Sequence, residues 1–166
     1  MVIMRSARKI SRKDLLRENF GYYLAGFIEG EGSFNISLRK KSDYKVRWQV
    51  VMSFNVSQKD PTLLYMLKDR LECGIIKVRK RDGLYSFDVT NPTDIIQKVI
   101  PFFQKYPVYS LSKKKNFVIF CKIAKLMERG QHRNQAGLRK ILELREHINE
   151  GIGRTRKYGI NDVFPK

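Results

Sequence analysis

Two glutamates separated by one glycine, in the run Glu29-Gly30-Glu31-Gly32, are the residues of this sequence best suited to chemistry. The apolar spacing before them predicts a helix, so the run falls at its carboxyl end. A carboxylate there meets the negative end of the helix dipole, an unfavourable placement of ~0.3–1 kcal/mol that a divalent cation would reverse. Alone, the run could equally be a solvated turn. Oxygen ligands favour a hard ion such as Mg²⁺, with phosphate oxygens and waters completing its shell.

The other residue types that bind metals are too scattered to compete with these carboxylates. Cys73 and Cys121 lie far apart and lack a C-x-x-C partner, which argues against a disulfide framework or a thiolate zinc site, so we expect two buried thiols. His132 and His147 lack the spacing of metal ligands. Carboxylates are therefore the only plausible metal ligands.

The charge of the chain indicates a polyanionic partner. Its 166 residues include 34 Lys and Arg against 16 Asp and Glu, a net charge of +18, which favours nucleic acid. A membrane surface is the rival partner, but no apolar run approaches the ~20 residues needed to span a bilayer. A hydrophobic content of 42% in a chain of this length predicts one domain with a core of its own.

The helix that carries the glutamates has two distinct faces. Its core face is predicted to hold Phe20, Tyr23, Leu24, Phe27 and Ile28. A second face, with Tyr22, Ala25, Gly26 and Glu29, is small enough for another helix to approach closely, although Gly in a helix costs roughly 1 kcal/mol relative to Ala. That contact could lie within the chain or between two copies of it.

Alternating and helical patterns follow one another along the rest of the chain. Two strands are predicted at 33–39 and 45–57 and two more at 75–81 and 84–90, the latter joined by a two-residue turn at Asp82-Gly83. Asp60-Pro61 opens a helix that ends at Cys73-Gly74. A further helix starts near Asn91 and reaches about Ile100, where Pro101 and Pro107 break the run, and two more helices follow, from Ser112 and up to Gly151.

These elements predict an α+β fold of order αββαββα, an antiparallel sheet with helices behind it. We expect three segments: a basic extension over 1–18 with a short helix capped by Ser11, one domain over 19–151, and a basic tail over 152–166 with Arg154, Arg156 and Lys157. Residues Met1–Lys13 lack the apolar region of a secretory signal, so the protein is expected inside a cell, in archaeal or bacterial cytoplasm or in an organelle.

One face of the predicted sheet is polar without acidic residues, which a merely solvated surface would not require. Amides read adenine and guanidinium groups read guanine in the major groove. The strand and loop residues expected to contact DNA are Asn35, Ser37, Arg39, Lys41, Arg47, Gln49, Asn55, Lys77, Arg79 and Arg81, with Ser53, Ser57 and no acid on the same face.

The run from Leu24 to Phe34, LAGFIEGEGSF, closely resembles the signature of the LAGLIDADG homing endonucleases, with Glu at both acidic positions. The resemblance implies that Glu31 and the carbonyl of Gly30 hold a divalent cation, Mg²⁺ or another such as Mn²⁺. In the single-motif, homodimeric branch of the family a Gln-Lys pair ends the second strand, matched by Gln58-Lys59. A lysine opens the helix after the second strand pair, matched by Lys113 at the head of Lys113-Lys114-Lys115.

The family implies a saddle-shaped fold and a site-specific double-strand break by metal-dependent hydrolysis of DNA. Gln58 would orient water and Lys113 would offset negative charge. One signature supplies one Glu31, so a homodimer joined through Tyr22, Ala25, Gly26 and Glu29, acting on a pseudo-palindromic target, is expected. Alternatives on the same fold are an intron maturase that binds RNA and a DNA-binding regulator without catalysis, and a basic ribosome-associated protein is a further one.

Overall fold

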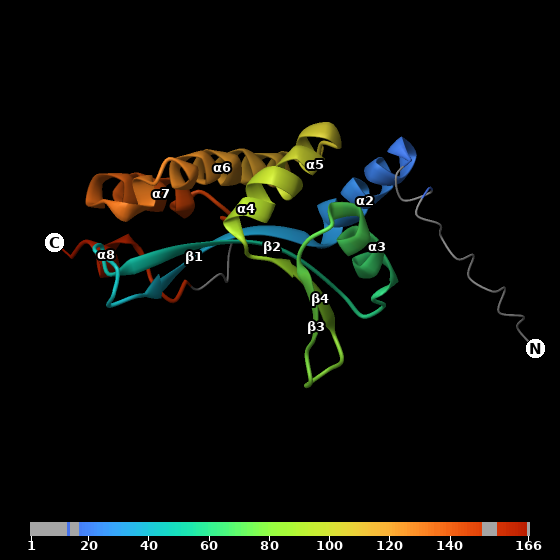
Figure 1. Cartoon of the computed structure of the whole chain (residues 1–166), viewed down its shortest axis with the longest axis horizontal. Coiled ribbons are helices and arrows are strands. Elements are labelled where there is room, and N and C mark those ends of the chain that lie inside the picture. Colours follow the sequence, from blue (N-terminus) through green and yellow to red (C-terminus); the bar gives the residue numbers. More distant parts are fainter. Residues whose placement is uncertain (1–12, 14–16, 151–155, 166) are drawn as a thin grey trace, which may run out of the picture.

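Residues 13, 17–150 and 156–165 are described by the computed structural model, a four-stranded antiparallel sheet with helices over one face (Figure 1). The predicted Ser11 cap, Gly151 and Arg154 lie outside these residues. In chain order the elements are α2 (Glu18–Glu31), β1 (Gly32–Lys40), β2 (Trp48–Gln58), α3 (Thr62–Leu71), β3 (Ile75–Val78), β4 (Tyr85–Val89), α4 (Pro92–Asp94), the π-helix η1 (Ile95–Val99), α5 (Ile100–Lys105), α6 (Leu111–Glu128), the 3-10 helix η2 (Gln131–Arg133), α7 (Gln135–Glu146) and α8 (Ile160–Val163).

The strands lie in the order β1-β2-β4-β3, which confirms the predicted α+β class and the αββαββα order. β1 and β2 pair from Gly32 with Val56 to Lys40 with Trp48. This register brings the start of β1 and the end of β2 to the same end of the sheet. The carboxyl end of α2, which leads directly into β1, therefore lies beside the last residues of β2.

The predicted alternation buries one face of the sheet under the helices. Phe34 on β1 is fully buried, and its ring lies 5.5 Å from Phe54, 5.1 Å from Phe103 and 5.2 Å from Phe120. Aromatic pairs of this kind contribute about 0.5–1.5 kcal/mol beyond the area that they bury. The cluster joins β1 and β2 to α5 and α6, and so fixes the helix that carries Lys113 over the sheet.

Both hairpin loops are longer than the sequence patterns predict. β2 begins at Trp48 rather than Lys45, because the N–H of Lys41 donates to the carbonyl of Arg47 at 3.0 Å and Arg47 takes a left-handed φ of 58°. The prediction of a two-residue turn at Asp82-Gly83 is wrong. The N–H of Arg79 donates to the carbonyl of Leu84 at 2.8 Å, so four residues form this turn.

Pro101 does not break its helix, contrary to the prediction. α4, η1 and α5 run on without interruption from Pro92 to Lys105, and the wide π-helical turn Ile95–Val99 ends two residues before the proline. Pro has no N–H and its ring crowds the carbonyl one turn earlier. A π-helical turn changes the hydrogen-bond step there, which accommodates the ring. The helix ends at Lys105, and Tyr106, its C-cap residue, directly precedes Pro107.

The described part of the predicted basic tail, 156–165, packs on the domain. The ring of Tyr158 lies 5.0 Å from that of Trp48. Arg145, only 3% exposed, donates to the carbonyl oxygens of Ile36 at 3.0 Å and Tyr158 at 2.9 Å. These contacts tie α7, β1 and the tail together. None of the helices in the described part of the chain is long and apolar enough to cross a bilayer.

Candidate active site and nucleic-acid interface

Three residues predicted to act together come from distant parts of the chain to one end of the sheet. Glu31 is the last residue of α2 and is exposed. Gln58 ends β2, two residues beyond Val56, the partner of Gly32. Lys113 lies in the first turn of α6, and its ammonium group donates to the carbonyl of Gly32. The junction of α2 and β1 is thus where all three meet.

The Lys113 amine is half-buried against this junction. Loss of solvent lowers its pKa from the ordinary value of 10.5, while the carboxylates of Glu29 and Glu31 act in the opposite direction. Burial has the larger effect. A partly desolvated cation beside two carboxylates is suited to meet negative charge that develops nearby, because attraction between charges is stronger where water is excluded.

Glu29 has a role within the chain that the sequence did not reveal. Its carboxylate accepts hydrogen bonds from the backbone N–H of Tyr109, at 3.1 Å and 3.2 Å to its two oxygens, and from the N–H of Ser110. Ser110 is the N-cap residue of α6. These bonds lower the pKa of Glu29. The residue therefore holds the start of α6, and with it Lys113, against the end of α2.

Because the carboxylate of Glu29 binds the start of α6, other oxygen atoms at the junction would have to serve as metal ligands. Those that are exposed are the carboxylate of Glu31 and backbone carbonyls at the end of α2. The last carbonyl groups of a helix have no partner within it, and Gly30 is among these residues. No group of three or more acidic, histidine or cysteine side chains in the described ranges could hold a metal ion by itself. The oxygen donors fit a hard divalent cation that takes its remaining ligands from outside the chain.

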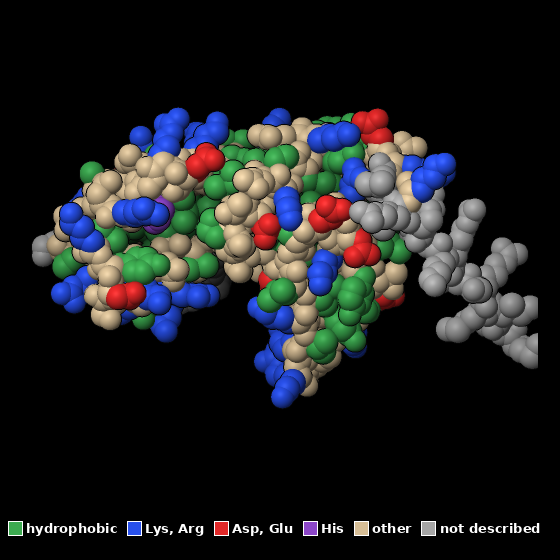
Figure 2. Space-filling view, in the orientation of Figure 1, with side chains coloured by type: hydrophobic (Ala, Val, Ile, Leu, Met, Phe, Trp, Pro, Cys, Tyr) green, Lys and Arg blue, Asp and Glu red, His purple; other side chains and the backbone are tan. Residues whose placement is uncertain are grey.

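The uncovered face of the sheet is hollowed, and Lys and Arg side chains lie on both sides of the hollow (Figure 2). Strand positions that share the polar face are Asn35, Ser37, Arg39, Gln49, Asn55 and Lys77. Of the other residues expected there, Lys41 and Arg47 lie in the first hairpin loop, and Arg79 and Arg81 at the second. The two hairpin loops thus carry four of the ten expected contacts.

The polar face does contain an acid, contrary to the sequence interpretation. Asp88 on β4 pairs with Asn55 on β2 and Ile75 on β3 in the register, and so lies in the middle of the face. Sequence reasoning missed it because only residues of three strands were considered. The amide of Asn55 donates to Asp88 at 2.8 Å, and Lys77 lies 3.2 Å from the same carboxylate.

The exposed face of α2 only partly matches the predicted interface. Tyr22 is 47% exposed, whereas Ala25 is 3% exposed and belongs to the chain's own core, so the placement of Ala25 on this face is wrong. A Cβ atom added at Gly26 or Gly30 would meet nothing within 4 Å. Packing within the chain therefore gives no reason for either glycine.

Two apolar residues beside this helix were missed by the sequence reasoning. Tyr109 is 75% exposed and Leu111 is 86% exposed. Both flank Ser110, which with Tyr109 binds Glu29, so they lie next to the end of α2. Large apolar residues exposed near one another are typical of surfaces where proteins bind other molecules. The sequence prediction starts this helix at Ser112, so both residues fell in the stretch before it and were not considered.

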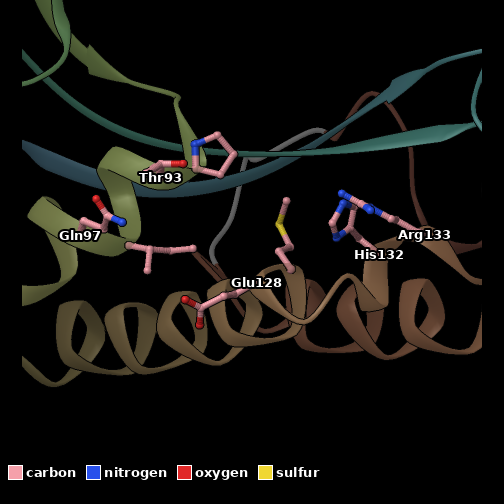
Figure 3. A pocket seen from close by; sticks show the side chains of 8 residues that line it. Thr93, Gln97, Glu128, His132 and Arg133 are labelled. Carbon is pink, nitrogen blue, oxygen red and sulfur yellow. The ribbon is translucent and has the colours of Figure 1, made fainter.

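A separate cavity of about 330 Å³ lies on the helical side of the molecule (Figure 3). Thr93 and Gln97 line it from α4 and η1, and Glu128, His132 and Arg133 from the end of α6 and η2. Burial lowers the pKa of His132. None of the residues lining this cavity belongs to the junction of α2 and β1, so it is no part of the candidate site.

The two cysteines are free and half-buried. Burial raises the pKa of Cys73 and of Cys121 to about 11. Both thiols are therefore protonated at neutral pH, and neither is activated for nucleophilic chemistry.

Comparisons with known proteins agree with this geometry. The chain is 31% identical over 146 residues to the probable intron-encoded endonuclease 2 of Neurospora crassa, covering 86% of this chain and 32% of the relative. It thus spans about a third of that relative's length. The homing endonuclease I-TnaI has a TM-score of 0.74 at 31% identity, over 82% of this chain and 90% of its own. I-LtrWI, a LAGLIDADG homing endonuclease bound to target DNA, has a TM-score of 0.80 at 29% identity, over 90% and 50%.

The family model described as LAGLIDADG endonuclease matches residues 24–124, from α2 to the last third of α6. The matched stretch includes Glu31, Gln58 and Lys113, the three residues that meet at the end of the sheet. The chain belongs to the LAGLIDADG endonuclease family.

Proposed function

We propose that this protein is a site-specific DNA endonuclease that cuts both strands of a pseudo-palindromic duplex as a homodimer. One observation carries the proposal: Glu31, Gln58 and Lys113 meet at the end of the sheet, next to a hollow face flanked by cations. A protein that only binds DNA or RNA needs the cations but not this set of three.

The chain's own residues divide the chemistry among them. The carboxylate of Glu31 and the carbonyl of Gly30 hold a divalent cation, Mg²⁺ or Mn²⁺, which when bound supplies an activated water and neutralises charge on the phosphate. The Gln58 amide orients the attacking water, since an amide can donate and accept at once. The Lys113 ammonium leaves the Gly32 carbonyl and donates to the phosphate oxygens as their negative charge grows.

Two copies meet through the exposed face of α2. Gly26 and Gly30 lie one turn apart with open space over both, so a second α2 can approach the backbone closely. Tyr22, Tyr109 and Leu111 supply apolar area around that contact. Since each chain supplies one Glu31, the dimer sets two such sites near one another, one for each strand. The near-complete coverage of the I-TnaI chain supports a unit of this size.

The hollow face takes one half of the target. A sheet in the major groove reads about one helical turn, ~10 bp. The structures of I-LtrWI and of the meganuclease I-SmaMI were obtained with bound DNA, which supports duplex DNA as the partner here. A two-fold protein requires a target with approximate two-fold symmetry.

The test is cleavage of a pool of randomised duplexes by the purified chain with Mg²⁺, with Mn²⁺ and with EDTA. We expect a selected set of related, roughly palindromic sequences to be cut in both strands, and cutting to stop in EDTA. Tight binding to duplex without any cut would contradict the assignment of catalysis. Binding to folded RNA in preference to duplex would instead support a splicing cofactor.

A further inference from the structure

The DNA-facing side of the sheet carries a carboxylate near its centre, which calls for a physical reason. Asp88 is 13% exposed, on β4 between β2 and β3. A bare negative charge facing phosphates weakens binding through simple repulsion. The role of Asp88 on this face must therefore follow from the groups that its carboxylate contacts.

Three donors converge on the two oxygens of Asp88. The Nδ2 group of Asn55 donates to Oδ1 at 2.8 Å, the hydroxyl of Ser86 donates to Oδ2 at 3.1 Å, and the Nζ atom of Lys77 lies 3.2 Å from Oδ2. An ionised carboxylate can only accept hydrogen bonds. The nitrogen of the Asn55 amide, and not its oxygen, must therefore face Asp88.

The orientation of the Asn55 amide on β2 also determines its contact with Asn35 on β1. With its nitrogen turned to Asp88, Asn55 points its Oδ1 atom to the other side, where it accepts from Asn35 Nδ2 at 2.8 Å and from the Ser53 hydroxyl at 3.5 Å. Asn35 Nδ2 also donates to the Ser33 hydroxyl at 3.0 Å. The Oδ1 atom of Asn55 is thus already bound by Asn35, and its second amide hydrogen is left for a ligand.

We propose that Asp88 is a positioning residue for base recognition, which fixes Asn55 as a hydrogen-bond donor toward the major groove. The inference rests on the proposed DNA binding and goes beyond it. An unconstrained Asn reads adenine with one acceptor and one donor. Asn55 instead selects a base that offers an acceptor, which guanine, adenine and thymine do. It disfavours cytosine, whose amino group only donates.

The test is selection of bound sequences from a pool of randomised duplexes in EDTA, so that binding is measured without cleavage. Asn55→Ala first identifies the base position that Asn55 reads. Asp88→Asn then removes the constraint, because an amide at 88 can donate as well as accept. Asp82→Asn is the matched control: it removes one negative charge from the same hairpin, where Asp82 pairs with Arg79 at 2.6 Å and does not touch Asn55.

The wild type should disfavour cytosine at that position by about five- to tenfold, as a single base-edge hydrogen bond would. Asp88→Asn should reduce this discrimination to less than twofold there and keep the preferences at distant positions, while Asp82→Asn should retain it. Unchanged discrimination in Asp88→Asn, even with a lower melting temperature, would overturn the proposal and leave Asp88 a structural residue. The absence of duplex binding by the wild type would overturn both this inference and the proposed function.

Discussion

Replacement of Glu29 by Gln tests how the signature helix places Lys113, the lysine that we propose as catalytic. The carboxylate accepts from the N–H groups of Tyr109 and Ser110 at the start of α6. A side-chain cap contributes ~0.5–2 kcal/mol, and the partly exposed carboxylate of Glu29 belongs in the lower half of that range because water competes for it. We take about 1 kcal/mol, which for a chain of 166 residues lowers the melting temperature by about 2–4 °C.

The loss of stability caused by Glu29→Gln should be larger at neutral pH than at low pH. The hydrogen bonds lower the pKa of Glu29 in the folded chain from its ordinary value of 4.5. Its contribution to stability is therefore complete above pH 4.5 and is lost as the pH falls through the folded pKa. Glu29 also raises the pKa of Lys113, so Glu29→Gln should move the alkaline loss of cleavage to lower pH.

The assay is thermal unfolding of wild type and variants at neutral pH and at the lowest pH where the wild type folds. Glu143→Gln, an exposed position on α7, is the charge-matched control. Glu31→Gln should behave in the opposite way: removing a carboxylate from the end of α2 relieves its clash with the dipole, with a gain of ~0.3–1 kcal/mol. A Glu29→Gln variant as stable as Glu143→Gln at neutral pH, or equally weakened at both pH values, would refute the reasoning.

Three further predictions concern the dimer interface at Gly26, the role of Lys113 and the salt dependence of DNA binding. Gly26 has open space around it, so Gly26→Leu should stabilise the monomer by up to about 1 kcal/mol through helix propensity. The same variant should dissociate the dimer, as light scattering after gel filtration would show. A dimer that persists would contradict the proposed interface. Lys113→Met should lower the cleavage rate by roughly 10²–10³ without loss of stability, because a desolvated ammonium is removed; unchanged single-turnover rates would contradict its role. If about 10 phosphates are neutralised per dimer, log affinity should fall with log salt with a slope near −9, and a slope near zero would count against DNA as the partner.

The sequence was sufficient for the presence of four strands in two hairpins, because alternation along Phe34, Ile36 and Leu38 and along β2 follows directly from burial of one face of a sheet. The order β1-β2-β4-β3, in which the hairpins join through β2 and β4, was not predicted. The sequence was also sufficient to bring Glu31, Gln58 and Lys113 into one hypothesis. It failed at Pro101, because a rule about one residue does not include the π-helical turn that accommodates it. It also missed α8, whose four residues are too few to show a period.

The parts of the site that the sequence did not predict depend on contacts between residues far apart in the chain. Nothing in Glu29 itself indicates that Tyr109 and Ser110 lie opposite its carboxylate, since that follows from how α6 packs on the sheet. Ala25 was assigned to the outer face because it is small, although it is buried in the core. Asp88 escaped attention because only residues of the other three strands were compared, and its neighbours on β2 and β3 become visible only through the register.

The most direct test of the account is a mixed dimer with one wild-type subunit and one Glu31→Gln subunit, separated by different affinity tags and assayed on a selected duplex with Mg²⁺. In the proposed dimer each subunit supplies one Glu31 for one strand. The mixed dimer should therefore nick a single strand, the wild-type dimer should cut both, and the double variant should bind without cutting. Cleavage of both strands by the mixed or the double variant would contradict the central role of Glu31 and the division of the two strands between two copies.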